Sequence, residues 1–371
     1  MSADETVISV EHVEVHFDDS GLMDKLFSRE KQVQAVDDVS LDIPENEVIA
    51  LVGESGCGKT TFGKAVVGLQ RPTGGSIKYR GQDIWEAKNG NGDIPFEDIR
   101  RSLQIIHQDP GSSLNPNRRV LSTLEEPLRR WESGLSEDER EARILAALKR
   151  VELTPVEDYA SRYPHQLSGG EKQRVALVRA LLMNPDLILA DEAVSALDVS
   201  LRVDMMDLML ELQDLIETSY LFISHDLSNA RYFTENCGGR IAIMYLGKIV
   251  EIGPAETVLA DPKHPYTKIL KWATPSLNPR IAKKQAEKET PLREIDIPDA
   301  VNPPSGCRFN TRCPEAREVC KKQAPQLESA NDPDHPAMCF RQFDNHEYWD
   351  SPPIDELKEF DPVEEEPITY D

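Results

Sequence analysis

Eight consecutive residues constrain the fold of this 371-residue chain more than any other feature. A short apolar run, residues 48–52, leads into a glycine-rich turn that fits the phosphate-loop pattern, and a helical stretch follows. The glycines let the backbone wrap closely around a phosphate, and the start of the helix adds partial positive charge. The turn predicts an ATP site rather than a chance loop, formed by Gly53, Glu54, Ser55, Gly56, Cys57, Gly58, Lys59, Thr60 and the adjacent Thr61.

Four polar side chains have distinct expected roles in ATP hydrolysis. Lys59 is expected to reach the β- and γ-phosphates, and the Thr60 hydroxyl is expected to ligate Mg²⁺. Further along, the apolar stretch 187–190 runs directly into Asp191 and Glu192. Burial of that stretch would fix Asp191 at the carboxyl end of a strand, where ligands bind in open α/β sheets. Asp191 is therefore a candidate magnesium ligand, and Glu192 a candidate general base toward the attacking water.

Two further polar residues follow predicted strands. Gln108 comes after the strand 103–107 and is a candidate for contact with magnesium or the attacking water. His225 follows the strand 220–224 and is a candidate partner of the γ-phosphate. Polar residues at strand ends usually just satisfy backbone groups, so this alternative stays open for both.

A serine and two glycines open another predicted helix, over residues 174–182. An ordinary capped helix start is one explanation of this pattern. The other is an anion site, and a second phosphate site so far along the chain makes sense if it faces the nucleotide of another subunit. The residues concerned are Ser168, Gly169 and Gly170.

Strand-like and helix-like stretches alternate along the chain, which indicates an α/β fold with a mainly parallel sheet. Residues 7–16 alternate in polarity like a half-buried strand, and residues 18–32 are expected to form a hairpin loop or insertion. The predicted domains are an ATP-binding domain with a helical insertion, a proline-bearing linker, a cysteine-containing module and an acidic tail, at residues 1–275 (insertion about 109–165), 276–304, 305–344 and 345–371.

Acidic residues outnumber basic ones by 66 to 42, which gives a formal charge of −24. This charge argues against a nucleic-acid partner, because phosphate-backbone binding needs an excess of Lys and Arg. It is expected either of a halophilic protein in a salt-rich cytoplasm or of an ordinary acidic cytosolic enzyme. With no run of about 18 apolar residues and no secretory signal, any membrane role is expected to come through a partner.

Four of the six cysteines, Cys307, Cys313, Cys320 and Cys339, crowd the last fifth of the chain. Four thiolates suit tetrahedral zinc or an iron–sulfur cluster, and reduced thiols or disulfides are the remaining alternative. The Cys-x2-Cys pairs of most zinc sites are missing, which favours the cluster. Because this segment is rich in proline and poor in apolar residues, a bound metal or cluster would contribute stability that hydrophobic burial does not supply.

The motifs in this order and spacing resemble the ATP-binding subunit of an ABC transporter over roughly residues 7–275. The resemblance rests on residues 53–60, Gln108, 167–170, 187–192, 195–198 and His225. It implies a P-loop ATPase core with an N-terminal antiparallel β part and a helical insertion. It also implies a second ABC ATPase subunit, on whose ATP Ser168, Gly169 and Gly170 close, and a role for residues 195–198, ending in Asp198, in coupling the two sites. Phe17 sits where the family often places an aromatic ring on adenine, with a core-facing strand residue as the alternative.

Further short motifs are similar to the oligopeptide/dipeptide importer branch: residues 34–40, 108–110, 113–116, 222–226, 244–248 and 264–267. Residues 194–198 resemble the second of the two paired ATPases of that branch. The resemblance implies two transmembrane permease subunits, indirectly an extracytoplasmic solute-binding protein, and a peripheral position on the cytoplasmic face of the cell membrane. For the cysteine segment it implies the [4Fe-4S] cluster of some members, with Zn²⁺ as the alternative.

Two departures from the family pattern leave the catalytic groups in place. Glu171 stands where the family most often has Gln, and Ala193 replaces the usual proline. A nickel or other small-solute importer shares these motifs and is the alternative within transport. Soluble ABC ATPases of translation or repair carry paired ATPase halves or long coiled coils, which this sequence lacks. The segment 167–173 argues against a P-loop kinase.

Overall fold

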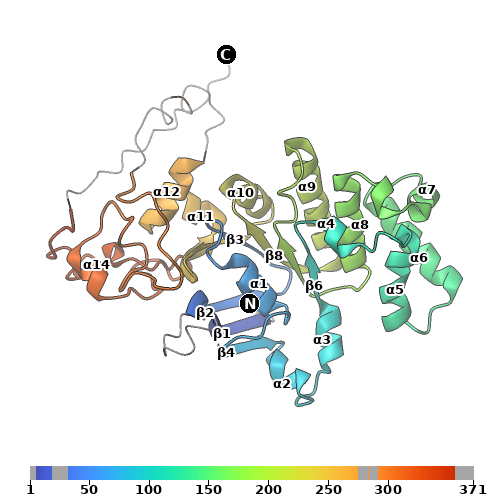
Figure 1. Ribbon diagram of the computed structural model, residues 1–371, viewed down its shortest axis with the longest axis horizontal. Helices are drawn as coiled ribbons and strands as arrows, with labels where there is room; N and C mark the ends of the chain where they lie inside the picture. The colour runs from blue at the N-terminus through green and yellow to red at the C-terminus, as the bar shows by residue number, and fades with distance from the viewer. Residues whose placement is uncertain (1–5, 19–31, 275–282, 284–290, 356–371) are drawn as a thin grey trace, which may run out of the picture. The chain divides into compact units, whose positions relative to one another are not determined.

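The computed structural model describes residues 6–18, 32–274, 283 and 291–355 (Figure 1). The predicted insertion at 18–32 falls largely outside these residues, as do parts of the predicted linker and tail. The chain divides into two compact units. The first unit is Met1–Val13, Ser40–Ala50 and Thr60–Ser224, and the second is Glu14–Val39, Leu51–Lys59 and His225–Asp371.

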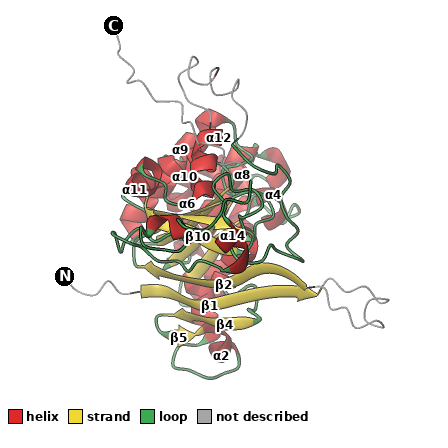
Figure 2. Cartoon of the chain, turned by 90° about the vertical axis from the view of Figure 1, so that its left-hand side faces the viewer, coloured by secondary structure: helices red, strands yellow, loops and turns green. Residues whose placement is uncertain are grey.

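Two sheets lie in the first unit. In the N-terminal sheet the hydrogen-bonded order is β2-β1-β4-β5, and the last pair is antiparallel (Figure 2). In the other sheet the order is β3-β8-β7-β6. The strands are β1 (Thr6–Asp18), β2 (Gln32–Pro44), β3 (Val48–Val52), β4 (Gly74–Tyr79), β5 (Gln82–Asp83), β6 (Leu103–Ile106), β7 (Leu187–Asp191) and β8 (Ser219–Ser224), with β1, β2 and β3 continuing into the second unit.

The strands β6, β7 and β8 run parallel, with Ile106 opposite Ala190 and Asp191 opposite Ile223. Every residue of β3, β7 and β8 is buried. Parallel strands covered on both faces need such continuous apolar runs, and this is why these segments could be predicted as strands. The structure confirms the α/β class, with a mainly parallel sheet and an antiparallel N-terminal part.

The helices of the first unit connect and cover these strands. The region predicted as a helical insertion contains α4 to α7. The helix predicted over residues 174–182 begins earlier, at Gly169, because the side chain of Ser168 caps it. The helices are α1 (Lys59–Val66), α2 (Ile84–Lys88), α3 (Phe96–Ser102), α4 (Pro110–Ser113), α5 (Val120–Trp131), α6 (Glu137–Arg150), α7 (Val156–Ser161), the 3-10 turn η2 (Pro164–Gln166), α8 (Gly169–Leu181) and α9 (Val199–Ile216).

The second unit is built around the antiparallel pair of β9 and β10, with the strand order β10-β9-β3. An aromatic cluster of Tyr245, Tyr266 and Phe309 is buried there, with ring centroids 4.7–5.4 Å apart. These rings join segments far apart in sequence into one core. The elements are α10 (Leu227–Glu235), β9 (Arg240–Tyr245), β10 (Lys248–Pro254), α11 (Ala255–Ala260), α12 (Pro265–Ala273), α14 (Glu318–Lys322) and the 3-10 turn η3 (Phe340–Gln342).

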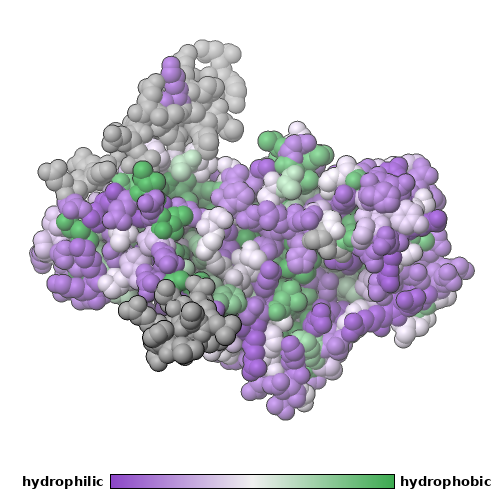
Figure 3. All heavy atoms as spheres, in the orientation of Figure 1, coloured by the Kyte–Doolittle hydropathy of each residue, from purple (hydrophilic) through white to green (hydrophobic). Residues whose placement is uncertain are grey.

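Hydrophilic residues predominate on the face of the molecule shown in Figure 3, as the high content of charged residues leads one to expect. Apolar residues form smaller patches between them. Among the described residues, no helix has the length and apolar character needed to cross a bilayer.

Candidate functional site

The phosphate loop is closed by its own lysine. Lys59 is buried, and its Nζ donates hydrogen bonds to the carbonyl oxygens of Gly53, at 2.8 Å, and Glu54, at 2.9 Å. The amide of Cys57 donates to the same Glu54 carbonyl at 3.3 Å. These bonds hold residues 53–59 in a tight turn that ends where α1 begins.

The glycine at position 58 is required by the shape of this turn. Its φ is +108°, and a Cβ added there would lie 1.9 Å from the carbonyl oxygen of Ala35. Gly56 also has a positive φ, +81°, but a Cβ at that position would meet nothing within 4 Å. Of the two left-handed glycines of this turn, Gly58 is therefore the one at which a side chain would also collide with neighbouring backbone.

In the first unit, the Thr60 hydroxyl donates to Oδ1 of Asp191 at 2.9 Å. Two of the three predicted magnesium ligands are thus in direct contact although 131 residues separate them. Asp191 ends β7 and is 7% exposed. Burial raises the pKa of its carboxyl, and the bond from Thr60 and the charge of Lys64 partly offset this. A divalent cation bound there would favour the ionised carboxylate.

Gln108 and Glu192 follow neighbouring parallel strands. Each lies two residues beyond the paired residues Ile106 and Ala190, so both stand at the carboxyl edge of the sheet. Gln108 is exposed and Glu192 is half-buried. This edge is where open α/β sheets bind ligands.

The backbone of Glu192 is left-handed, with a φ of 50°. Its N–H donates to the carbonyl of Ile223 at 3.1 Å, and its own carbonyl accepts the Ser195 hydroxyl at 2.8 Å and the Ser195 amide at 3.1 Å. Non-glycine residues rarely adopt this conformation, and here the hydrogen bonds to Ile223 and Ser195 hold Glu192 in it. The fold therefore fixes the direction in which the Glu192 side chain leaves the strand.

Two other predicted site residues lie at the surface. His225 directly follows β8 and is exposed. Phe17 is the penultimate residue of β1 and is 41% exposed, so its ring does not face the core. Of the two explanations considered for Phe17, the core-facing strand residue is wrong.

The serine of the second glycine motif caps α8. Its hydroxyl accepts from the Glu171 amide at 3.3 Å, and Glu171 accepts from the Ser168 amide at 2.7 Å, which forms a capping box. Tyr159 donates to the same Glu171 carboxylate at 2.6 Å. Glu171, which stands where the resembled family most often has Gln, thus serves as the N3 residue of the box. Ser168 and Gly169 are exposed and Gly170 half-buried, which leaves this helix start accessible to a partner.

Asp198 is likewise the N-cap of a helix, α9. Its carboxylate accepts from the Leu201 amide at 3.1 Å as the N-cap of α9, and Asp198 is exposed. The short loop before it contains Ser195, which binds the Glu192 carbonyl. The loop 192–198 therefore links the end of β7 to the start of α9.

Two functional contacts were not predicted from the sequence. Arg312 forms a two-pronged ion pair with Glu54, with N–O distances of 2.7 and 2.9 Å, and the Tyr266 hydroxyl accepts from the Glu54 amide at 2.9 Å. Tyr266 lies in residues 264–267, which resemble a motif of the importer branch but do not indicate a contact with the phosphate loop. Arg312 directly precedes Cys313, and no local pattern marks it as a partner of the phosphate loop.

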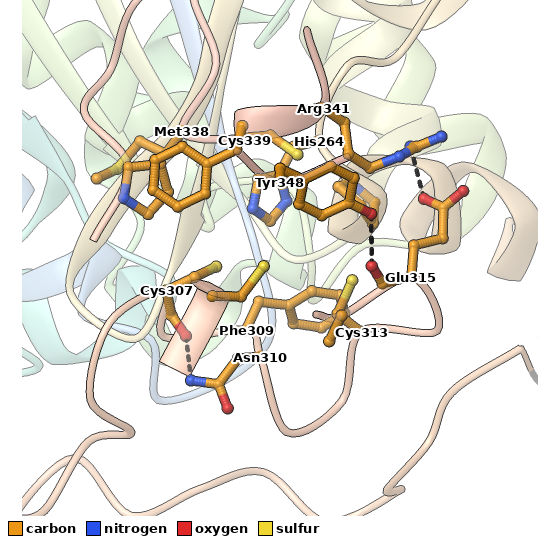
Figure 4. Close-up of a pocket in the computed structure, with 15 residues that line it drawn as sticks. His264, Cys307, Phe309, Asn310, Cys313, Glu315, Met338, Cys339, Arg341 and Tyr348 are labelled. Carbon is orange, nitrogen blue, oxygen red and sulfur yellow. Dashed lines mark hydrogen bonds and ion pairs between the residues drawn. The ribbon is translucent and has the colours of Figure 1, made fainter. Parts of the chain in front are cut away.

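In the second unit, all four clustered cysteines line one pocket. Figure 4 shows the thiols of Cys307, Cys313 and Cys339 turned toward the space beside Tyr348 and Phe309. All four are free thiols. The Tyr348 hydroxyl donates to the Glu315 carbonyl at 2.6 Å at the rim (Figure 4).

Burial raises the pKa of each of these thiols, to about 12 for Cys307 and Cys339. Unligated, they are protonated and unreactive at neutral pH, because the thiolate is the nucleophile. Across the described residues, no group of three or more His, Cys, Asp or Glu side chains is placed to hold a metal ion. The pocket gathers four sulfur donors from Cys307, Cys313, Cys320 and Cys339.

Comparison with known proteins identifies two matching regions. Residues 36–195 match the family described as ABC transporter. Residues 250–320 match the family described as the C-terminal region of oligopeptide/dipeptide transporters. The second match includes Cys307, Cys313 and Cys320 but ends before Cys339.

Similar curated proteins cover nearly the whole chain. The dipeptide transport ATP-binding protein DppF of Haemophilus influenzae is 41% identical over 83% of this chain and 89% of its own length. The oligopeptide transport ATP-binding protein AppF of Bacillus subtilis is 39% identical over 90% of this chain and 97% of its own length. Among solved structures, the dimeric ATP-binding cassette MJ0796 with ADP and phosphate has a TM-score of 0.56 at 30% identity, over 67% of this chain and 98% of that one.

Proposed function

We propose that this chain hydrolyses ATP to power the import of short peptides. The chain belongs to the ATP-binding subunits of the oligopeptide/dipeptide ABC transporters. The contact between the Thr60 hydroxyl and Asp191, at 2.9 Å, carries the hydrolytic part of the proposal. It joins the end of the phosphate loop to the carboxyl end of β7, where a nucleotide-bound cation would be held.

The roles proposed for the chain follow from where each group lies. Thr60, Asp191 and Gln108 would hold Mg²⁺, which supplies neutralising charge to the β- and γ-phosphates. The loop amides and Lys59 bind the phosphates, and Glu192, at the edge of the sheet, accepts a proton from the attacking water. His225 orients the γ-phosphate through a hydrogen bond. Catalysis here rests on positioning and charge neutralisation, without a covalent intermediate on the protein.

A second ATPase subunit is part of the proposal. The solved cassette MJ0796 is described as dimeric with ADP and phosphate, and it is 30% identical to this chain. The exposed start of α8, at Ser168 and Gly169, supports closure of each subunit on the ATP of the other. The loop ending at Asp198 would couple the two sites, and Phe17, exposed at the end of β1, would stack on adenine.

The remaining partners would be two permease subunits, with an extracytoplasmic binding protein that selects the solute. The chain would act as a peripheral subunit at the cytoplasmic face of the membrane. Peptide is favoured over nickel as cargo by the match of residues 250–320 to the peptide-transporter C-terminal region.

The cargo can be tested in proteoliposomes that contain the chain with its permeases, its partner ATPase and its binding protein. We expect a di- or oligopeptide to stimulate ATP hydrolysis and to accumulate inside the vesicles. A nickel chelate serves as the control ligand. Stimulation by nickel alone would contradict peptide import and would leave the ATPase assignment in place.

We also propose that the cysteine pocket binds a four-iron cluster. All four cysteines line one pocket, and a four-iron cluster binds each cysteine at a different iron. The sequence has none of the Cys-x2-Cys pairs of most zinc sites, which favours the cluster over a single zinc ion. The cluster's positive charge would convert the buried thiols to thiolates. Its proposed role is structural, because it would tie Cys307, Cys313, Cys320 and Cys339 together.

Protein purified without oxygen tests this second proposal. We expect a brown colour that dithionite bleaches, with iron and acid-labile sulfide in nearly equal amounts. Replacement of Cys313 by Ser should remove the colour, while the same change at the exposed Cys237, outside the pocket, should not. Colourless protein with one zinc per chain, or with neither metal, would contradict the cluster.

A further inference from the structure

Glu54 of the phosphate loop is held through three of its groups at once. Its carboxylate binds Arg312, its amide donates to the Tyr266 hydroxyl, and its carbonyl accepts from Lys59. Arg312 and Tyr266 lie far outside the loop in sequence, 258 and 212 residues away. The loop conformation therefore depends on residues that have no contact with phosphate in the roles described above.

Arg312 is itself fixed before it reaches the loop. Its side chain is 4% exposed, and its guanidinium lies 5.7 Å from the ring centroid of Tyr245 and 5.9 Å from that of Phe309. Its backbone amide donates to the Phe309 carbonyl at 3.1 Å, and its carbonyl accepts from the Arg293 amide at 3.1 Å. A buried, stacked guanidinium loses little freedom when it forms a two-pronged pair, so this pair is stronger than one at the surface.

The charge of Glu54 gives the pair a second consequence. Its side chain is 27% exposed, and it sits in a loop built to receive several phosphate charges. An unpaired carboxylate there would repel the nucleotide phosphates. It would also be free to adopt other conformations that distort the loop. Arg312 neutralises this charge and holds both carboxylate oxygens of Glu54.

We propose that Arg312 is a positioning residue for the ATP site, which acts through Glu54 to hold the phosphate loop ready for the nucleotide. Its guanidinium contacts the Glu54 carboxylate and lies over the rings of Tyr245 and Phe309. The inference rests on ATP binding at residues 53–60. Arg312 immediately precedes Cys313, which lines the cysteine pocket. A residue beside that pocket thus controls the affinity of the ATP site.

The full-length chain tests this through four variants. Arg312→Gln should raise the KM for MgATP about tenfold and change kcat little, because the pair assists binding and not the chemical step. Adding Glu54→Gln to that variant should recover most of the affinity, since it removes the unpaired charge. Arg312→Lys, with charge but no fork, should fall between. Binding of a fluorescent ATP analogue gives the same ranking without turnover.

Arg317→Gln is the matched control. Arg317 lies in the same C-terminal segment and donates to the carbonyls of Trp349 and Ser351, with no contact to the loop. Its KM should stay at the unsubstituted value. An unchanged KM in Arg312→Gln, an equal rise in Arg317→Gln, or no recovery in the double variant would each overturn the proposal. Thermal melting checks folding, and Arg312→Lys carries the test if Arg312→Gln does not fold. Failure of the unsubstituted chain to bind ATP would instead contradict the ATP site itself.

Discussion

Replacement of Glu192 by Gln is expected to lower kcat for ATP hydrolysis by about a thousandfold or more, within the range for loss of a general base. ATP should stay bound, because Gln is isosteric and the phosphate loop is untouched. The amide of Gln cannot accept the proton of the attacking water. The left-handed backbone of Glu192, with its φ of 50°, and its bonds to Ile223 and Ser195 should persist in the variant.

Glu217→Gln is a close control for this experiment. Glu217 is an exposed glutamate of the same unit, has a φ of 54° and caps the end of α9. The control matches both the charge change and the backbone conformation of Glu192→Gln. The Glu217→Gln variant should hydrolyse ATP at the unsubstituted rate. Steady-state release of phosphate gives kcat, and equilibrium binding gives retained ATP. Turnover by Glu192→Gln at more than about a tenth of the original rate would contradict the role of Glu192 as base.

Gly58→Ala is expected to weaken ATP binding by about a hundredfold or more, because strained backbone and steric overlap act together. At a φ of +108°, the new methyl group would lie 1.9 Å from the Ala35 carbonyl oxygen, which belongs to backbone and cannot turn aside. The loop must therefore open, and its amides then no longer point at a common phosphate.

Gly56→Ala separates the cost of the left-handed backbone from the cost of steric overlap with Ala35. Its φ of +81° carries the same kind of backbone cost, but the added methyl group meets nothing within 4 Å. We expect it to reduce affinity far less than Gly58→Ala. Binding of a fluorescent ATP analogue measures both, and circular dichroism checks that each variant is folded. Equal losses at the two positions would show that left-handed backbone alone, and not the approach to Ala35, makes Gly58 necessary.

The parts of the fold that could be predicted are those with local causes. The strands β3, β7 and β8 are continuous apolar runs because both of their faces are covered, and a single segment shows this. The contact of Thr60 with Asp191 could be anticipated because parallel strands present their carboxyl ends at one edge. The helix α8 begins five residues before the predicted residues 174–182, because the Ser168 side chain caps it at Gly169.

Long-range polar contacts could not be predicted in this way. Arg308 pairs with Asp37 across 271 residues, and the charges of Arg308 and Lys248 lower the pKa of Asp37 although burial acts to raise it. Nothing in the periodicity near Arg308 indicates its partner. The same holds for His335, which pairs with the fully buried Glu251 at 2.7 Å. The cysteine spacing predicted a shared site, but it did not indicate the contacts of Arg308 with Asp37 or of His335 with Glu251.

These long-range polar contacts have a consequence for how such a chain can change over generations. Removing one partner of such a contact destabilises a fold, because the other partner is left with unpaired polar groups. Asp37, Glu54 and Glu251 each depend on a basic residue from the last 65 positions: Arg308, Arg312 and His335. A variant that lost its C-terminal segment would lose all three contacts at once, and Asp37 would keep its pair with Lys248. We therefore expect substitutions at these three basic positions to be tolerated only together with changes at the carboxylates that they contact.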